Sequence, residues 1–201
     1  MEKATTLRLP LFMLIAGIFG LSMLVPAIYA LSLEMFHMSR SFLYSAVLTV
    51  SALALIGIAI RGRERRATSL DHLLALFCIF TFLPVILAVP FYEAMQTTSF
   101  MNAYFEMVSS ITTTGATLFD PPDRLAMPLH LWRAQVGWMG GAIMWIAAGA
   151  VQSPLSLGGF EVTARGGTGS ATTERGQFSA ADPMKRWMRA AYVLLPVYAG
   201  L

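Results

Sequence analysis

The stretch "SSITTTGATLFD", residues 109–120, places three threonines and a glycine directly before the double proline at Pro121 and Pro122. It lies in a chain of 201 residues of which 56% are hydrophobic and only 12% are charged, with a mean hydropathy of +0.63. Such a composition is typical of a membrane protein rather than a soluble domain. A short polar stretch with a glycine can neither cross a bilayer nor form a buried strand. The sequence therefore predicts an irregular segment among membrane-spanning helices.

The apolar stretches predict four complete membrane spans and the beginning of a fifth. They cover residues 9–31, 41–60, 70–91, 129–151 and 188–201. At about 1.5 Å per residue, each complete stretch can cross a hydrocarbon core of about 30 Å. The first stretch is longer than the apolar part of a typical signal peptide. The last has 14 residues, short of the roughly 17 needed to cross, so we expect a piece of a longer protein.

The residues just before the threonines predict a helix that enters the membrane without crossing it. Ser99 can cap a helix over residues 99–110, whose length of about 18 Å is roughly half a membrane. With a cytoplasmic N-terminus and this re-entrant segment, eleven of the fourteen Lys and Arg residues fall on the inside, as is usual in membrane proteins. A full crossing would instead move the five basic residues within 165–189 to the outside.

Irregular backbone at membrane depth is tolerated where protein buries it or where it lines a water-filled path. The C-terminal end of a half-span helix carries unpaired carbonyl groups and about half a negative charge, which favours cations. Thr112, Thr113 and Thr114 are expected to continue as extended backbone whose carbonyls replace part of an ion's hydration shell. Gly115 is expected at positive φ, where it lets these carbonyls turn to one side. The alternative is an ordinary threonine-rich loop.

The order of "FEMVSSITTTGAT", "PPD" and "LWRAQVGWMGG" resembles the first pore unit of the TrkH/KtrB/HKT superfamily of potassium transporters, in particular the TrkH branch. Residues 104–141 carry the most specific part of the resemblance. It implies an all-α membrane protein: two N-terminal transmembrane helices, then one helix, re-entrant pore helix, filter and helix unit, and the start of a next helix. One departure is Ser110 and Ile111, where the family often has a glycine. The implied segments are residues 1–66 for the first two helices, 67–152 for the pore unit with its pore helix at 99–110 and filter at 112–117, 153–187 for a cytoplasmic linker and 188–201 for the next helix.

The resemblance implies a bacterial inner-membrane protein that takes up potassium and needs no cofactor. Whether it also transports sodium is left open. Thr112, Thr113, Thr114 and Gly115 match the filter positions, and Ala116 and Thr117 complete the filter segment. Because four such units surround one path in the family, the implied partners are the lipid bilayer and further pore units of the same or another copy. A homo-oligomer is expected, and a homotetrameric channel and a non-conducting scaffold remain alternatives. A cytoplasmic nucleotide-binding regulatory subunit of Rossmann type is a further implied partner.

Three positions near the filter are expected to support it. Glu106, an ionisable group within the half-span helix, is expected to brace the filter from behind by a hydrogen bond. Arg133 is expected to reach the outer surface or to pair with an acid of the outer loop. Gly137 and Gly141, four residues apart, are expected to allow close approach of another helix.

Other classes of function find no support in the sequence. The three histidines, His37, His72 and His130, lack the spacing of metal ligands, and no catalytic constellation is visible. Residues 165–177 lack the phosphate-loop pattern, so a flexible linker is expected there. The single Cys78 excludes a disulfide framework within the chain. Neither an enzyme nor a nucleic-acid-binding protein is predicted.

Overall fold

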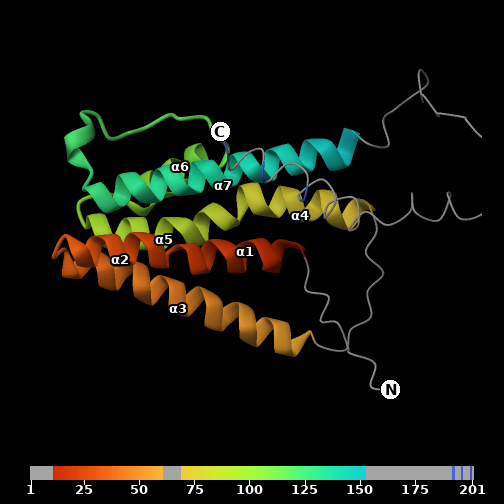
Figure 1. The fold of residues 1–201 in the computed structure, drawn as a ribbon, viewed down its shortest axis with the longest axis horizontal. Helices are drawn as coiled ribbons and strands as arrows, with labels where there is room; N and C mark the ends of the chain where they lie inside the picture. Colours follow the sequence, from red (N-terminus) through yellow and green to blue (C-terminus); the bar gives the residue numbers. More distant parts are fainter. Residues whose placement is uncertain (1–10, 61–68, 153–191, 193–195, 197–199, 201) are drawn as a thin grey trace, which may run out of the picture. The chain divides into compact units, whose positions relative to one another are not determined.

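The computed structural model describes residues 11–60 and 69–152 and the single positions 192, 196 and 200, and within these ranges every regular element is a helix. Contacts divide the chain into two units, Met1–Gly141 and Ala142–Leu201. The packing and the site described below lie in the first, and α7 extends past its end. The predicted linker at 153–187 lies outside the described residues, as does all but three positions of the predicted helix at 188–201. The elements are α1 Leu11–Ser22, α2 Leu24–Ser32, α3 Phe36–Ala59, α4 Ser69–Thr81, α5 Leu83–Met95, α6 Phe100–Ile111, the 3-10 helix η1 Pro122–Arg124 and α7 Met127–Gln152 (Figure 1).

Three helical stretches are long and apolar enough to span a membrane: Leu11–Ser32, Phe36–Ala59 and Leu74–Met95. They coincide with the first three predicted spans, apart from shifts of up to five residues at their ends, and confirm an all-helical membrane protein. The outward side of α3 carries side chains such as Leu48, which is 68% exposed, as expected for contact with lipid. α7 has 26 residues, or about 39 Å at 1.5 Å per residue, and its crossing stays a prediction.

The first and third spans are broken helices, whereas the apolar stretches of the sequence predicted continuous ones. Pro26 follows the break between α1 and α2 at Met23, and Pro84 follows the break between α4 and α5 at Phe82. Proline has no N–H group and its ring clashes with the carbonyl four residues earlier, so a helix kinks or breaks there. Each break leaves backbone carbonyls without their usual helical donors.

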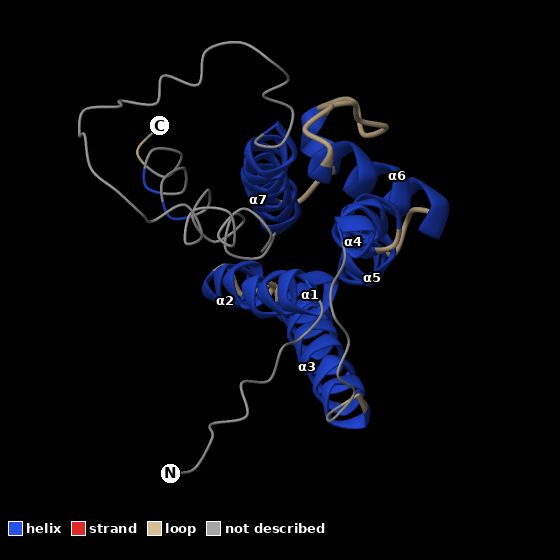
Figure 2. Ribbon diagram, turned by 90° about the vertical axis from the view of Figure 1, so that its right-hand side faces the viewer, coloured by secondary structure: helices blue, strands red, loops and turns tan. Residues whose placement is uncertain are grey.

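The helices pack as two groups that meet along α3 and α5. α3 packs on α1, α2 and α5, while α5 packs on α4 and α6. The helices are seen nearly end-on in Figure 2, where α4, α5 and α6 lie together and α1 lies next to α3. Phe42 of α3 and Trp132 of α7, both fully buried, meet edge to face with their ring centroids 5.7 Å apart. This core supports α6 and the loop that follows it.

Candidate functional site

The short helix α6 is fixed at its beginning by two polar contacts. The Ser99 side chain accepts a hydrogen bond from the Asn102 N–H at 3.3 Å, which is the cap expected from the sequence. The Tyr104 hydroxyl donates to the Thr81 carbonyl at 3.1 Å, at the break between α4 and α5. The helix has 12 residues, about 18 Å at 1.5 Å per residue. Its entry into the membrane from one side stays a prediction.

The C-terminal end of α6 closes in a Schellman motif. The Thr114 N–H donates to the Ser109 carbonyl and the Thr113 N–H to the Ser110 carbonyl, both at 2.9 Å. This motif requires a left-handed residue, usually glycine, and here Thr113 takes that place with φ of +56°. A β-branched residue is rare in this conformation, so the threonine type gave no signal for it. The prediction of extended backbone was therefore wrong for Thr113 and also for Thr112, which has φ of −84° and ψ of 1°. Gly115 has the expected positive φ, at +76°.

Four backbone carbonyls, those of residues 112–115, lie in and directly after this turn. Among the residues that the structure describes, no donor pairs with the carbonyl oxygens of Thr112, Thr113, Thr114 or Gly115. The threonine hydroxyls are occupied differently: the Thr112 hydroxyl donates to the Val108 carbonyl at 2.7 Å and lies 2.8 Å from the Thr114 hydroxyl. Within the described residues, the four carbonyls are therefore available to coordinate a cation.

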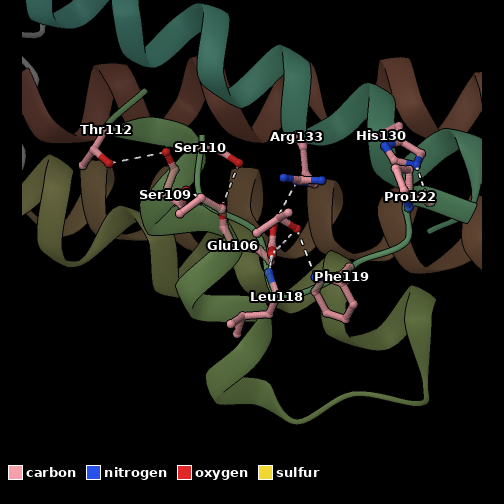
Figure 3. Close-up of polar contacts among 11 residues, drawn as sticks. Glu106, Ser109, Ser110, Thr112, Leu118, Phe119, Pro122, His130 and Arg133 are labelled. Carbon is pink, nitrogen blue, oxygen red and sulfur yellow. Dashed lines mark hydrogen bonds and ion pairs between the residues drawn. The ribbon is translucent and has the colours of Figure 1, made fainter. Parts of the chain in front are cut away.

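Glu106 holds the chain after Gly115 against α6. Its side chain is fully buried, and Oε1 accepts hydrogen bonds from the Leu118 N–H at 2.6 Å and the Thr117 hydroxyl at 2.8 Å. One turn further along α6, the Ser109 hydroxyl donates to the Ala116 carbonyl at 2.6 Å. Figure 3 shows Glu106 and Ser109 facing the returning loop. The segment from Ala116 to Leu118 is thus bound to the helix that precedes it.

Arg133 of α7 pairs with the other oxygen of Glu106. Its Nε lies 2.9 Å from Oε2, and the Arg133 side chain is 20% exposed (Figure 3). The N–H is not directed at the oxygen well enough to form a hydrogen bond, so charge attraction is the main component of this contact. The expectation that Arg133 reaches the surface or an acid of the outer loop was wrong, because the buried carboxylate lies nearer.

Two glycines let α7 approach the end of α6. A Cβ atom at Gly140 would lie 2.7 Å from the carbonyl carbon of Ile111 and closer still to its oxygen. A Cβ atom at Gly137 would lie 3.5 Å from the Ser110 oxygen, which is an ordinary contact. Gly140 thus makes the close approach and Gly137, three residues earlier, an ordinary contact, while the expected role of Gly141 stays a prediction. Gly140 faces the peptide directly before Thr112.

An open cavity of about 380 Å³ lies beside the turn, with Thr113 and Gly115 on one side and His130 and Arg133 on the other. The His130 ring is held by a contact of 2.9 Å between Nε2 and the Pro122 carbonyl (Figure 3). Within the described ranges, no group of three or more His, Cys, Asp and Glu side chains could hold a metal ion. Main-chain carbonyls of the turn thus lie beside this cavity, where the described residues place no cluster of acidic or histidine side chains.

Comparisons with known proteins give relatives of one kind. No family model matches the chain. It is 30% identical to the Trk system potassium uptake protein TrkG of Escherichia coli over 146 residues, which are 71% of this chain and 29% of that protein. It is 28% identical to TrkH of Vibrio parahaemolyticus over 150 residues, 74% of this chain and 31% of that protein. TrkI of Halomonas elongata is 36% identical over 83 residues, 41% of this chain and 16% of that protein.

The matched region of this chain is thus about three tenths of the length of TrkG and TrkH. The matches agree with the resemblance that residues 104–141 carry, and further TrkH proteins match over a similar share of the chain. The chain therefore belongs to the TrkH superfamily.

Proposed function

We propose that this chain supplies one pore unit of a potassium uptake protein, in which the carbonyl oxygens of residues 112–115 coordinate the dehydrated ion. The observation that carries this proposal is the run of four carbonyls, directly after the C-terminal end of a helix of about half-membrane length, that find no donor in the described part of the chain. Helix ends of this polarity favour cations, and backbone carbonyls replace the hydration shell of K⁺ in selectivity filters. The names of the relatives, all potassium uptake proteins, support the choice of ion.

The surroundings of the turn fit a filter better than a mobile loop. A filter must keep its oxygens in place while an ion passes, because their positions decide for which ion they can replace the hydration shell. Here buried Glu106 binds the chain on the far side of Gly115, and the Schellman motif fixes the near side. An ordinary threonine-rich loop would need neither a buried carboxylate nor a threonine held at positive φ.

One such turn supplies oxygens from one side only, so the proposed site needs further pore units to surround an ion. The relatives TrkG and TrkH are each about three times as long as their matched region, which leaves room in them for more units. We propose four units around one path, contributed by the rest of a longer chain. A homotetramer of this chain is the alternative, and a particle with fourfold symmetry formed by residues 1–201 alone would favour it.

The other proposals concern the surroundings of the pore. The relatives are bacterial, and we place this protein in the bacterial inner membrane with its N-terminus in the cytoplasm, on the distribution of basic residues. A cytoplasmic nucleotide-binding subunit is proposed to contact the linker at 153–187. The protein is proposed to be a transporter and not an enzyme, with K⁺ as cargo.

Growth of a bacterium deficient in potassium uptake tests the filter. The protein expressed from its complete reading frame is expected to restore growth at low potassium, and Gly115→Asp to abolish it. Aspartate at φ of +76° strains the turn and adds a fixed charge beside the carbonyls. Gln96→Asp is the matched control, since Gln96 is exposed, has φ of +57° and lies outside the filter. Restored growth with Gly115→Asp would refute the assignment of the filter to residues 112–115.

A further inference from the structure

α7 presents two different stripes to its neighbours. At about 100° per residue, Trp132, Gln135 and Val136 lie on one stripe, and Arg133, Gly137 and Gly140 lie on another, about 100° away. The second stripe contacts α6, through Glu106 and the backbone of Ser110 and Ile111. The first contacts other parts of the fold: Trp132 donates to the Leu87 carbonyl at 3.2 Å. α7 therefore connects the filter turn to helices outside it.

The bond of Gln135 crosses from the pore unit to the N-terminal helices. Its Nε2 donates to the Ser22 carbonyl at 2.8 Å, across 113 residues of sequence. In a continuous helix, the N–H of residue 26 would pair with this carbonyl, but residue 26 is proline and has no N–H. Within the described ranges, Gln135 is the donor that replaces it. A carbonyl left unpaired in hydrocarbon is costly, so the bond favours one fixed position of α7 against the break.

The other helix beside the filter turn, α6, is held in a similar way. The Val85 N–H, which would normally pair with the Thr81 carbonyl, instead donates to the Phe82 carbonyl at 3.1 Å. The Tyr104 hydroxyl of α6 takes the free place at Thr81, at 3.1 Å. Both α6 and α7 are thus bound, through a side chain, to a carbonyl released where a long helix breaks.

We propose that Gln135 is a positioning residue for the filter, through which the N-terminal helices fix α7 and so set the spacing of the filter carbonyls. This inference rests on the proposed function for the role of those carbonyls, but the bond and its coupling to Pro26 do not depend on it. Gln135 touches no filter atom in the described structure; on the same helix, Gly137 and Gly140 lie against the backbone of Ser110 and Ile111, directly before the filter. The pore unit therefore depends on helices that contribute no oxygen to the ion path.

A double-mutant cycle between Gln135 and Pro26 tests the proposal in the protein expressed from its complete reading frame. Gln135→Met keeps the side-chain length and removes the donor. Interhelical hydrogen bonds in membranes contribute between about 0.6 and 1.7 kcal/mol, so we expect the unfolding midpoint to fall by about 1–7 °C. We expect the ratio of K⁺ to Na⁺ uptake to fall about threefold. In a Pro26→Ala background, the new N–H of residue 26 pairs with Ser22, and both losses should shrink to less than half.

Ser22→Ala is the matched control, because the bond ends on the Ser22 carbonyl and not on its hydroxyl, and it should leave the selectivity ratio unchanged. The cycle compares Gln135→Met in both backgrounds, so a cost of Pro26→Ala by itself cancels. Tyr104→Phe, which removes only the donor to Thr81, should also lower the selectivity ratio.

Unchanged selectivity in both Gln135→Met and Tyr104→Phe, or an equal loss with and without Pro26→Ala, would overturn the inference. The outcomes separate from those of the filter proposal: transport by Gly115→Asp refutes the filter, while the cycle in unfolding midpoints still reports whether Gln135 replaces the missing N–H of residue 26.

Discussion

The contact between Gly140 and Ile111 gives the sharpest test of how α7 shapes the filter. A methyl group at residue 140 would lie 2.7 Å from the Ile111 carbonyl carbon, whereas ordinary contacts of a Cβ begin at 3.4 Å. The helices must then separate by more than 0.7 Å, the difference between these two distances, because the Ile111 oxygen lies closer still, or the last turn of α6 must shift. Overpacking of this kind costs about 1–3 kcal/mol. Because the peptide of Ile111 directly precedes Thr112, the shift is transmitted to the first carbonyl of the proposed filter.

We therefore expect Gly140→Ala to lower the unfolding midpoint by about 2–12 °C, given 2–4 °C per kcal/mol for a chain of this size. We also expect it to reduce K⁺ uptake and the preference for K⁺ over Na⁺. The matched control is Gly137→Ala, whose methyl group would meet the Ser110 oxygen at 3.5 Å and fits without movement. Uptake into vesicles, followed with a radioactive tracer or a fluorescent ion indicator, measures transport and selectivity. Thermal unfolding in detergent measures the unfolding midpoint. Equal behaviour of the two variants would refute the close approach of α7 to α6.

Two other variants probe the turn itself. Glu106→Gln removes the charge that pairs with Arg133, and we expect it to lower the unfolding midpoint. Breaking a buried ion pair costs up to about 3–5 kcal/mol, and less where one partner is part-exposed, as Arg133 is here. Adding Arg133→Gln should recover part of the loss, whereas a further, additive loss would argue against the pair. Thr113→Gly relieves the left-handed strain of about 1–2 kcal/mol but raises the conformational entropy of the unfolded chain, so we expect an unfolding midpoint near that of the wild type. We expect the selectivity for K⁺ over Na⁺ to fall. Unchanged selectivity would show that the threonine is not needed to hold the turn.

The fold could be predicted where the signal was local in sequence. Long apolar runs fixed the number and approximate ends of the first three spans, and Ser99 indicated the beginning of α6. The helix breaks were also encoded locally, since Pro26 and Pro84 lie a few residues after them, but a hydropathy window averages over a single proline. The ends of the spans therefore shifted by a few residues, and the breaks were missed.

The site was predictable only in part, for a different reason. Gly115 at positive φ follows from the residue type, because glycine alone adopts this conformation without a Cβ clash. Thr113 at positive φ does not, since a β-branched residue disfavours it and only the hydrogen bonds of Thr113 and Thr114 to α6 keep it there. The close approach at Gly140 likewise depends on the rotation of α7, which spacing along one helix does not define.

By itself, the amino-acid sequence determined the class of protein, the short helix before the threonines and the resemblance to a family, because composition, periodicity and motif order are properties of neighbouring residues. Only the tertiary structure decided that Glu106 binds the returning loop and pairs with Arg133, and that Gln135 replaces an N–H that proline lacks 109 residues earlier. These contacts join polar groups far apart in the chain. They form because a polar group buried among apolar helices needs a partner, and packing alone decides which one is within reach.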